Sequence, residues 1–508
     1  MCFFMARKKI ISQFGVLVFS VCCVASVVAR GPVDADADAA ETTQYQAVHA
    51  CEADKSWVTK PSMPEDVTAD ATNCEFQQFM WRTFLYLVQP EKKKSAILNF
   101  ETWMPSYGIF VAADKQPTAW GSVPKAPFCA SSQSSAPAAN HVFSNLTLQA
   151  GSDQPLIDKQ GNDVFYTVSV NKPAYQFITG CDLYRAQCAL TLAPDVYNEA
   201  NFTVVDIPHS YPDLAFPDYS IELKASWKVL TDSERRSKRF YTVPGTVQSP
   251  GSACLSNVTL GLVGMHIIYK TPNHPEFIWA TFEHKNNAPN CSDVSAKPPL
   301  GGDWTFYNSS CQGEACDTNT YFPGKPTQVC RMHPWGDPTI GTFPNNLNCE
   351  SIPPPGYICD PDVRKYVIDP NTANLKLINA SVEKMLHTLK RKDRNRLWAN
   401  YELVGNVWTK NGSLPPVTQS QFGSLASANT TMETFVQNGV SNMTNPNNCF
   451  SCHNLEGQTV ASGPNQARTP VTLPPAGLSH IFNFLDVQSK GCGNGTALPA
   501  ACPGANSQ

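Results

Sequence analysis

The chain has 508 residues, of which 42% are hydrophobic and 16% are charged. This length predicts two to three domains, or one large elaborated domain. The formal net charge of −4 gives no electrostatic reason to expect a nucleic-acid partner.

Residues 1–29 have the pattern of an export signal. A basic start from Arg7 to Lys9 precedes an apolar stretch from Ile10 to Val28, and the small Ala29 follows. An uncleaved membrane anchor is the alternative, but polar residues interrupt the stretch and favour cleavage. No later segment has about 20 unbroken apolar residues. We therefore expect an exported protein, periplasmic or extracellular at the cell surface, with no integral membrane segment in the mature chain.

The 19 cysteines agree with export, because disulfides persist in oxidising compartments. Three of them precede residue 30 and two belong to a motif described below, so fourteen remain, enough for seven disulfides. Spacing does not determine which cysteines pair. The short-range candidates are Cys181–Cys188, Cys311–Cys316, Cys349–Cys359 and Cys492–Cys502.

The first regular element expected is a helix that follows a loose segment at residues 30–70. Thr72 and Asn73 are suitable capping residues for a helix from Cys74 to about Val88, which carries aromatic residues at helical spacing. Large aromatic side chains are most often buried, so we expect this aromatic stripe to be core.

Residues 100–300 change to the alternating pattern of strands. From Ile221 to Val229, apolar residues alternate with Glu222, Lys224, Ser226 and Lys228. Neighbouring strands connected by short turns form an antiparallel sheet. The other candidate strands are Arg239 to Val243, ended by Pro244-Gly245, and then Leu260 to Lys270 and Phe277 to His284, with a hairpin turn at Thr271 to Glu276.

Pro, Gly, Asn and Cys dominate residues 286–365, which predicts irregular loops pinned by disulfides. Helical periodicity resumes from Asn371 to about Leu389. A further helix is expected from Leu425 to Gly439.

The sequence Cys449-Phe450-Ser451-Cys452-His453 has the spacing of a covalent haem attachment motif. Two thiols one turn apart can add to the two vinyl groups of one haem, and the adjoining His453 can ligate the iron. The alternatives are a short disulfide, a thioredoxin-like pair and a zinc site. No βαβ pattern surrounds the motif and no second close cysteine pair lies nearby, so we expect one haem c.

The sixth iron position has several candidates. No Met follows His453, and His480 is the later histidine, in an apolar segment. Met432 and Met443 lie upstream and are alternatives. Two histidine ligands usually give a lower reduction potential than His and Met, whereas an open position favours small-ligand chemistry. We expect His480 to be the distal ligand.

Other candidates are weaker. His266 and His284, with Glu283, lie on adjacent expected strands and suggest either a metal site or hydrogen-bonded sheet histidines; we favour the second. Two basic runs, residues 235–239 and 390–396, could dock an acidic redox partner or mark a membrane surface. A helix end explains the second run, and we favour a purely structural role for both. No motif nominates a catalytic residue, so enzymatic activity stays open.

Several segments together resemble a known group of proteins. That group is the uncharacterised bacterial exported single-haem proteins of the cytochrome c family, and the resemblance covers most of the mature chain. It implies haem binding through Cys449, Cys452 and His453, and it implies no substrate. The segments are Gly261-Leu-Val-Gly-Met-His-Ile, Trp279-Ala-Thr-Phe-Glu-His, Trp398-Ala-Asn-Tyr-Glu-Leu-Val-Gly, Leu425-Ala-Ser-Ala-Asn-Thr-Thr-Met-Glu-Thr-Phe and the aromatic helix around Trp81 and Phe84.

We therefore expect an α+β fold in three parts: a signal peptide at 1–29, a disulfide-rich, mainly antiparallel β domain at 30–365, and a helical cytochrome c-like haem region at 366–508. The expected function is electron transfer to or from a redox partner protein or small electron carrier. The alternatives are a haem-dependent oxidoreductase whose β-rich part binds a substrate, and a surface-binding protein with a structural haem.

Overall fold

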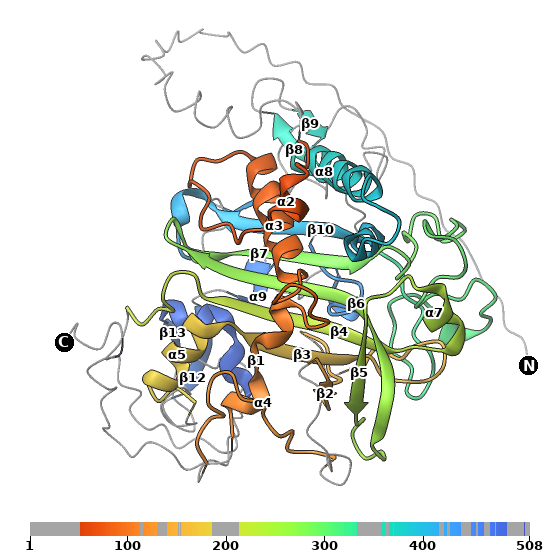
Figure 1. Ribbon diagram of the computed structural model, residues 1–508, viewed down its shortest axis with the longest axis horizontal. Coiled ribbons are helices and arrows are strands. Elements are labelled where there is room, and N and C mark those ends of the chain that lie inside the picture. Colours follow the sequence, from red (N-terminus) through yellow and green to blue (C-terminus); the bar gives the residue numbers. More distant parts are fainter. Residues whose placement is uncertain are drawn as a thin grey trace, which may run out of the picture. The chain divides into compact units, whose positions relative to one another are not determined.

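A curled, mostly antiparallel sheet forms the centre of the computed structural model (Figure 1). The described residues all belong to one compact unit, Thr43–Gln508. The expected signal at 1–29 lies outside them. The structure describes residues 51–111, 115–129, 140–150, 152, 154–184, 213–332, 357–360, 365–368, 370–415, 421–423, 427–437, 449–453, 456–461, 468–472, 474–484 and 502.

The main sheet runs in the order β1-β3-β4-β6-β7-β10-β11, with β5 beside β6 and β2 paired to β5. Every pairing in it is antiparallel except the one between β2 and β5. The mainly antiparallel prediction is therefore confirmed. The strands are β1 Met104–Pro105, β2 Val142–Ser144, β3 Phe165–Val170, β4 Ile221–Val229, β5 Thr242–Val247, β6 Leu255–Thr271, β7 His274–His284, β10 Tyr401–Thr409 and β11 Gln421–Gly423. Separate two-stranded ribbons are formed by β8 Tyr357–Asp360 with β9 Lys365–Ile368, and by β12 Glu456–Ala461 with β13 Arg468–Thr472.

The helices are mostly short, and the two longest pack side by side. The hydroxyl of Thr72 accepts a hydrogen bond from the backbone N–H of Glu75, whose carboxylate accepts from Thr72 in return, so the predicted cap is confirmed. The helices are α2 Ser56–Thr59, α3 Asn73–Leu87, α4 Ser106–Ile109, α5 Lys172–Gly180, α7 Asp232–Ser237, α8 Pro370–His387 and α9 Cys449–Cys452. The 3₁₀ turns are η1 Asn99–Thr102, η5 Glu314–Cys316, η6 Arg394–Asn400, η7 Lys410–Gly412, η8 Thr434–Val436, η9 Pro475–Ser479 and η10 Ile481–Phe484.

One face of the sheet is covered by α3 and α8, which confirms that the aromatic stripe is core. Phe84 of α3 stacks on Phe282 of β7 with ring centroids 4.3 Å apart, an arrangement that adds about 1 kcal/mol beyond area burial. The Trp81 indole donates to Asn379 of α8 (2.9 Å), and the Asn379 amide donates to the Leu403 carbonyl of β10 (2.8 Å). These bonds tie both helices to the sheet.

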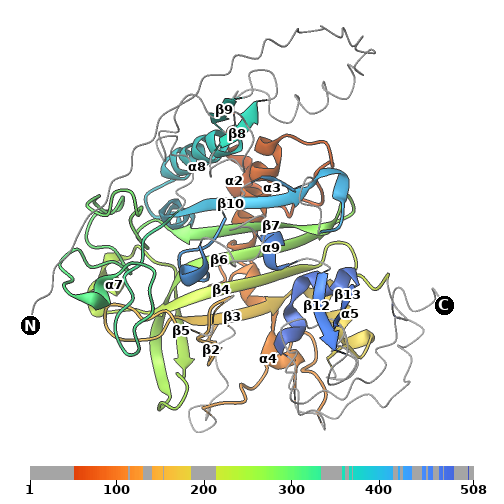
Figure 2. The same cartoon turned by 180° about the vertical axis from the view of Figure 1, so that it is seen from behind.

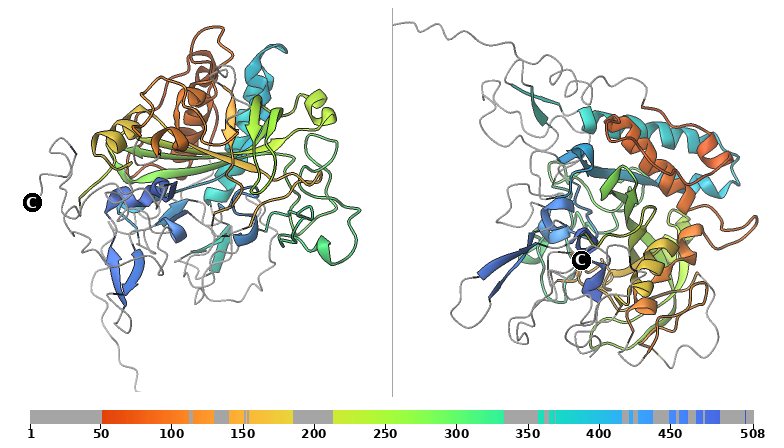
Figure 3. Two further views of the ribbon diagram at one scale, coloured as in Figure 1. Left: turned by 90° about the horizontal axis from the view of Figure 1, so that it is seen from below. Right: turned by 90° about the vertical axis from the view of Figure 1, so that its left-hand side faces the viewer.

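The opposite face carries the C-terminal segments. Figure 3 (left) shows α3 and α8 on one side of the sheet and the blue C-terminal elements on the other, and Figure 2 views the second side directly. The strand register lines up the residues of this face in rows across β4, β6 and β7. Row one is Glu222, Ile268 and Trp279; row two is Lys224, His266 and Thr281; row three is Ser226, Gly264 and Glu283.

The expectation of a helical region at 366–508 is not met in the described residues. Strand β10 belongs to that region, yet it pairs with β7 in the main sheet. Residues 427–437, expected within a helix from Leu425 to Gly439, form turns and the short η8 instead. Their side chains bond to the sheet, as described below, so tertiary contacts outweigh local helical periodicity.

Two strand predictions need correction. Strand β5 does not end at Pro244-Gly245 but contains both residues. Gly245 is required there because an added Cβ atom would lie 2.3 Å from a methyl carbon of Leu260. The hairpin between β6 and β7 turns in two residues, Pro272-Asn273, rather than six, because Thr271 already pairs with His274.

Among the disulfides, the predicted Cys311–Cys316 bridge is confirmed. The predicted Cys181–Cys188 and Cys492–Cys502 pairs are wrong, because Cys181 bonds to Cys502 across 321 residues of sequence. The tail returns to the end of α5, and residue spacing carries no sign of that return. Of the predicted pair Cys349–Cys359, Cys349 lies outside the described residues, so this pair stays a prediction. Among the described residues, the other bridges are Cys51–Cys74, Cys129–Cys254 and Cys291–Cys330.

Candidate functional site around His453

The predicted haem motif forms one helical turn against the C-terminal face of the sheet. The backbone N–H of His453 donates to the carbonyl of Cys449 (2.8 Å), which places these two residues on the same side of the turn. Phe450 is buried in an apolar cluster and anchors the turn there, while Cys449 is half-buried at the edge of that cluster. Cys452 is the last residue of α9.

The imidazole of His453 is held from two sides. Its Nδ1 lies 2.7 Å from the carbonyl oxygen of Leu478. A carbonyl only accepts hydrogen bonds, so Nδ1 carries the proton and Nε2 keeps its lone pair. The indole of Trp279 lies beside the ring with centroids 4.3 Å apart, and its own N–H donates to the Glu276 carbonyl (3.1 Å). This is the hydrogen-bonding arrangement of a metal-ligating histidine.

His480 lies directly beside His453, 27 residues away in sequence. The two ring centroids are 4.0 Å apart and the rings are tilted by 33°. His480 follows η9 with a positive φ of 56°, which is uncommon for a residue other than glycine. Burial lowers the pKa of His480 to about 4, so the ring is neutral at pH 7. Neutral imidazole is the form that binds a metal.

The fit of a haem differs between these two histidines. Metal–imidazole bonds are about 2 Å long, so two rings on opposite sides of one iron have centroids about 6 Å apart. His453 and His480 are 4.0 Å apart. The residues therefore fit a haem held through His453, and a second iron bond from His480 requires the rings to separate by about 2 Å.

An apolar wall surrounds these rings. It comes from α9, η9, η10, strand β7 and Phe216, and its buried side chains exclude water, which strengthens electrostatic interactions inside. The rings of Phe216 and Phe482 stack with centroids 6.1 Å apart. The buried members of the wall closest in sequence to the two histidines are Phe450, Ala476, Leu478, Ile481 and Phe482.

Sequence reasoning missed Glu222 at this site. The hydroxyl of Ser479 donates to its carboxylate at 2.5 Å. Desolvation raises the pKa of Glu222 to about 8, against the lowering effect of Ser479 and Lys224, so much of this carboxyl is protonated at pH 7. The alternation of β4 placed Glu222 on its polar face correctly but gave no sign that residues 474–484 cover that face.

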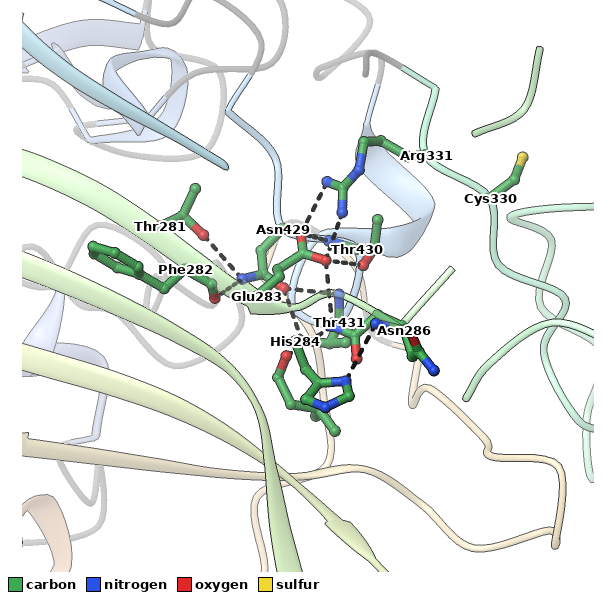
Figure 4. A network of polar contacts seen from close by, with 12 residues as sticks. Thr281, Phe282, Glu283, His284, Asn286, Cys330, Arg331, Asn429, Thr430 and Thr431 are labelled. Carbon is green, nitrogen blue, oxygen red and sulfur yellow. Dashed lines mark hydrogen bonds and ion pairs between the residues drawn. The ribbon is translucent and has the colours of Figure 1, made fainter. Parts of the chain in front are cut away.

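A buried network fastens residues 427–437 onto β7 (Figure 4). The Glu283 carboxylate accepts two bonds from the Arg331 guanidinium (3.1 and 2.8 Å) and further bonds from the N–H (2.7 Å) and the hydroxyl of Thr430. The amide of Asn429 donates to the Thr281 hydroxyl (2.9 Å) and to the Phe282 carbonyl (3.2 Å). This chain segment leads toward the turn that carries His453.

The two sheet histidines do not converge on one ion. His266 pairs with Glu433 (Nε2 to Oε1 3.0 Å), whereas His284 stacks on Phe240 at 4.1 Å and bonds to the Arg239 carbonyl. Burial lowers the pKa of His284 to about 3. Within the ranges that the structure describes, no three His, Cys, Asp or Glu residues are grouped to hold a metal ion. Both are hydrogen-bonded sheet histidines.

The remaining sequence candidates lie elsewhere. Met432 is buried in a third core cluster with Phe306, away from the apolar wall of the His453 site, and Met443 lies outside the described residues. Arg396 donates to the carbonyls of His387 and Leu389, the end of α8, as expected of a basic residue at a helix end. In the other basic run, Arg239 donates to the carbonyl of Gly301 (2.6 Å).

The structure thus brings together the predicted residues Cys449, His453 and His480, and adds Trp279 and Glu222. In the part of the chain that is described, no helix has the length and apolar character needed to cross a membrane. No protein-family model, curated protein or solved structure matches this chain.

Proposed function

We propose that this protein is an exported c-type cytochrome that carries one haem, attached through Cys449 and Cys452 and ligated by His453, and that it transfers electrons to or from a partner. The observation that carries the proposal is the hydrogen bond from His453 Nδ1 to the Leu478 carbonyl at 2.7 Å. It fixes the tautomer in which Nε2 carries the ring's lone pair, the form of imidazole that ligates metals, on a residue that directly follows a Cys-X-X-Cys turn.

When bound, the haem supplies one-electron redox chemistry. The residues of this chain orient it and control its surroundings. Leu478 fixes the tautomer of His453, Trp279 limits rotation of the imidazole, and the apolar wall excludes water. A dry setting around a metal favours the less charged redox state, and so these residues tune the reduction potential.

Export is supported by the five disulfides of the described residues. Such bonds persist in oxidising compartments and are rare in reducing ones. Covalent attachment of haem in the same oxidising compartment is consistent with them.

A second candidate function is haem-dependent chemistry on a small ligand. The observation that favours it is the 4.0 Å contact between the rings of His453 and His480, which is too short for both imidazoles to hold one iron between them. An iron with an open sixth position binds small ligands, whereas one with two histidine ligands is closed.

The test is to produce the full chain in a host that exports and attaches haem c, and to record its absorption spectrum after denaturation and extraction. We expect one haem per chain that resists extraction from the wild-type protein and is absent from the Cys449→Ala/Cys452→Ala variant. The double variant Cys311→Ser/Cys316→Ser removes another close cysteine pair and is the matched control, which keeps its haem. Wild-type protein without covalent haem refutes the proposal.

Carbon monoxide distinguishes the two candidates. If His480 closes the site, CO binds slowly to the reduced wild-type protein and rapidly to His480→Ala. Rapid binding to both proteins favours the open site, and a low-spin spectrum unchanged by His480→Ala contradicts His480 as the ligand.

A further inference from the structure

Lys224 stands out among the charged residues of the covered sheet face. It lies in row two of β4, two residues from Glu222, and its side chain is half-buried. Residues two apart on a strand point to the same face and are separated by about 7 Å. Glu222 touches Ser479, the neighbour of His480 in sequence. Lys224 therefore lies two residues along β4 from Glu222, which contacts the proposed haem site.

Lys224 has no ion pair among the described residues, since no carboxylate oxygen lies within 4.0 Å of its Nζ. Desolvation by burial lowers the pKa of Lys224, and the charges of Glu433 and Glu222 act against this lowering. Its Nζ lies over the face of the Tyr166 ring, 5.2 Å from the ring centroid. Three other covered lysines, two in the sheet and Lys285 directly after β7, are each paired with a carboxylate. Lys228 binds Asp158 (3.1 Å) and Glu234 (2.9 Å), Lys270 binds Asp218 (2.5 Å), and Lys285 binds Glu383 (2.7 Å).

The carboxylates that act on Lys224 from a distance already have other partners. Glu222, on the same strand, accepts from Ser479. Glu433, from the covering segment, pairs with His266 (3.0 Å) and accepts from the backbone N–H of Asn429 (2.8 Å). Withdrawing an ammonium from water without a partner is costly. An anion bound beside Lys224 would supply the missing partner and favour its charged form.

We propose that Lys224 binds a carboxylate of the ligand held beside His453, and that this carboxylate is a haem propionate. The assignment to propionate rests on the proposed haem; the assignment of a carboxylate-binding lysine does not. An ammonium–carboxylate bond is charge-assisted and stronger than a neutral hydrogen bond. If a haem is bound, the positive charge of Lys224 beside its propionate would stabilise the reduced state.

The first experiment uses haem-loaded full-length protein with haem labelled by ¹³C at the propionate carboxyls. Infrared difference spectra between the oxidised and reduced forms report the propionate stretching bands. We expect Lys224→Met to shift these bands and to lower the reduction potential, and Lys224→Arg, which keeps the charge, to restore both. Lys297→Met is the matched control, because Lys297 is exposed and this substitution removes the same charge at a different place.

The second experiment uses ¹³C-acetate as the probe and measures its NMR line broadening. In the haem-free Cys449→Ala/Cys452→Ala protein we expect acetate binding, weakened by about tenfold to a hundredfold when Lys224→Met is added, as for loss of a charged hydrogen bond. We expect no acetate binding to the haem-loaded wild type, because the propionate occupies Lys224.

The remaining outcomes are decisive. One outcome is that acetate binds to the haem-loaded protein, that this binding depends on Lys224, and that Lys224→Met leaves the propionate bands unmoved. This outcome supports Lys224 as a carboxylate-binding residue for a free small carboxylate, and it overturns the assignment to propionate. Acetate binding unaffected by Lys224→Met, together with unmoved propionate bands, overturns the proposal. If the purified wild type contains no haem, the proposed function fails, while the acetate comparison still decides the role of Lys224.

Discussion

Replacing Glu283 by Gln perturbs the network that holds residues 427–437 on the sheet. The Glu283 side chain is fully buried and the Arg331 side chain is 7% exposed. The carboxylate accepts from the Arg331 guanidinium, from Thr430 twice, and from the Asn287 amide at 3.3 Å. Every one of these partners is a donor, so the amide NH₂ of a glutamine faces another donor wherever it turns, and the guanidinium loses its counter-charge.

Breaking a buried ion pair by removing one partner costs about 3–5 kcal/mol. We expect Glu283→Gln to lower the free energy of unfolding by about that amount, measured by denaturant unfolding of the haem-loaded protein. The control is Asp232→Asn, which breaks the exposed pair with Arg235, whose side chains are 71% and 49% exposed. Exposed pairs contribute at most about 1 kcal/mol.

The double variant Glu283→Gln/Arg331→Met measures the interaction energy between Glu283 and Arg331 apart from the other contacts of each residue. Because the guanidinium is then removed as well, the double variant is expected to be more stable than the sum of the two single losses predicts, by about 1–3 kcal/mol. A loss below 1 kcal/mol for Glu283→Gln, or strict additivity of the two changes, refutes the view that this network fastens the segment.

Three further outcomes follow from the disulfides and the buried titrating groups. Cys502→Ser opens a loop of 321 residues and is expected to lower the free energy of unfolding by roughly 5 kcal/mol. Cys311→Ser opens a loop of 5 residues and is expected to lower it by roughly 2 kcal/mol. Equal shifts in melting temperature for the two variants would contradict this expectation. In the haem-free Cys449→Ala/Cys452→Ala protein, the folded pKa of His480 lies below its unfolded value, so its contribution to stability is present above pH 6.5 and lost as pH falls toward 4, by up to about 3 kcal/mol. His480→Phe in the same background is expected to remove this slope from urea midpoints measured across that range. The folded pKa of Glu222 lies above its unfolded value, so the contribution of Glu222 to stability is present below pH 4.5 and lost as pH rises toward 8. Glu222→Gln is therefore expected to gain stability relative to wild type between pH 5 and pH 8. A difference in stability between the two proteins that stays constant over this range speaks against the raised pKa.

Local patterns in the sequence were sufficient for the elements whose structure depends on near neighbours. Thr72 and Glu75 form a cap because they are three residues apart, and the apolar spacing of α3 matches one helical face. Strand β4 was predicted over its full length, since alternation alone indicates which residues share a face. The helix predicted across residues 427–437 was wrong because polar side chains of this segment bond to β7, and no local sequence pattern indicates such a distant contact.

The sequence by itself therefore determined the mainly antiparallel sheet, the two long helices and the Cys449–His453 motif as the candidate site. Only the tertiary structure decided that the polar face of β4 is covered, that Cys181 pairs with Cys502, and that His480 lies against His453. The physical reason is the range of the interactions. Caps, turns and alternation act over a few residues, whereas the partner of a half-buried group such as Lys224 depends on which distant segment folds over it.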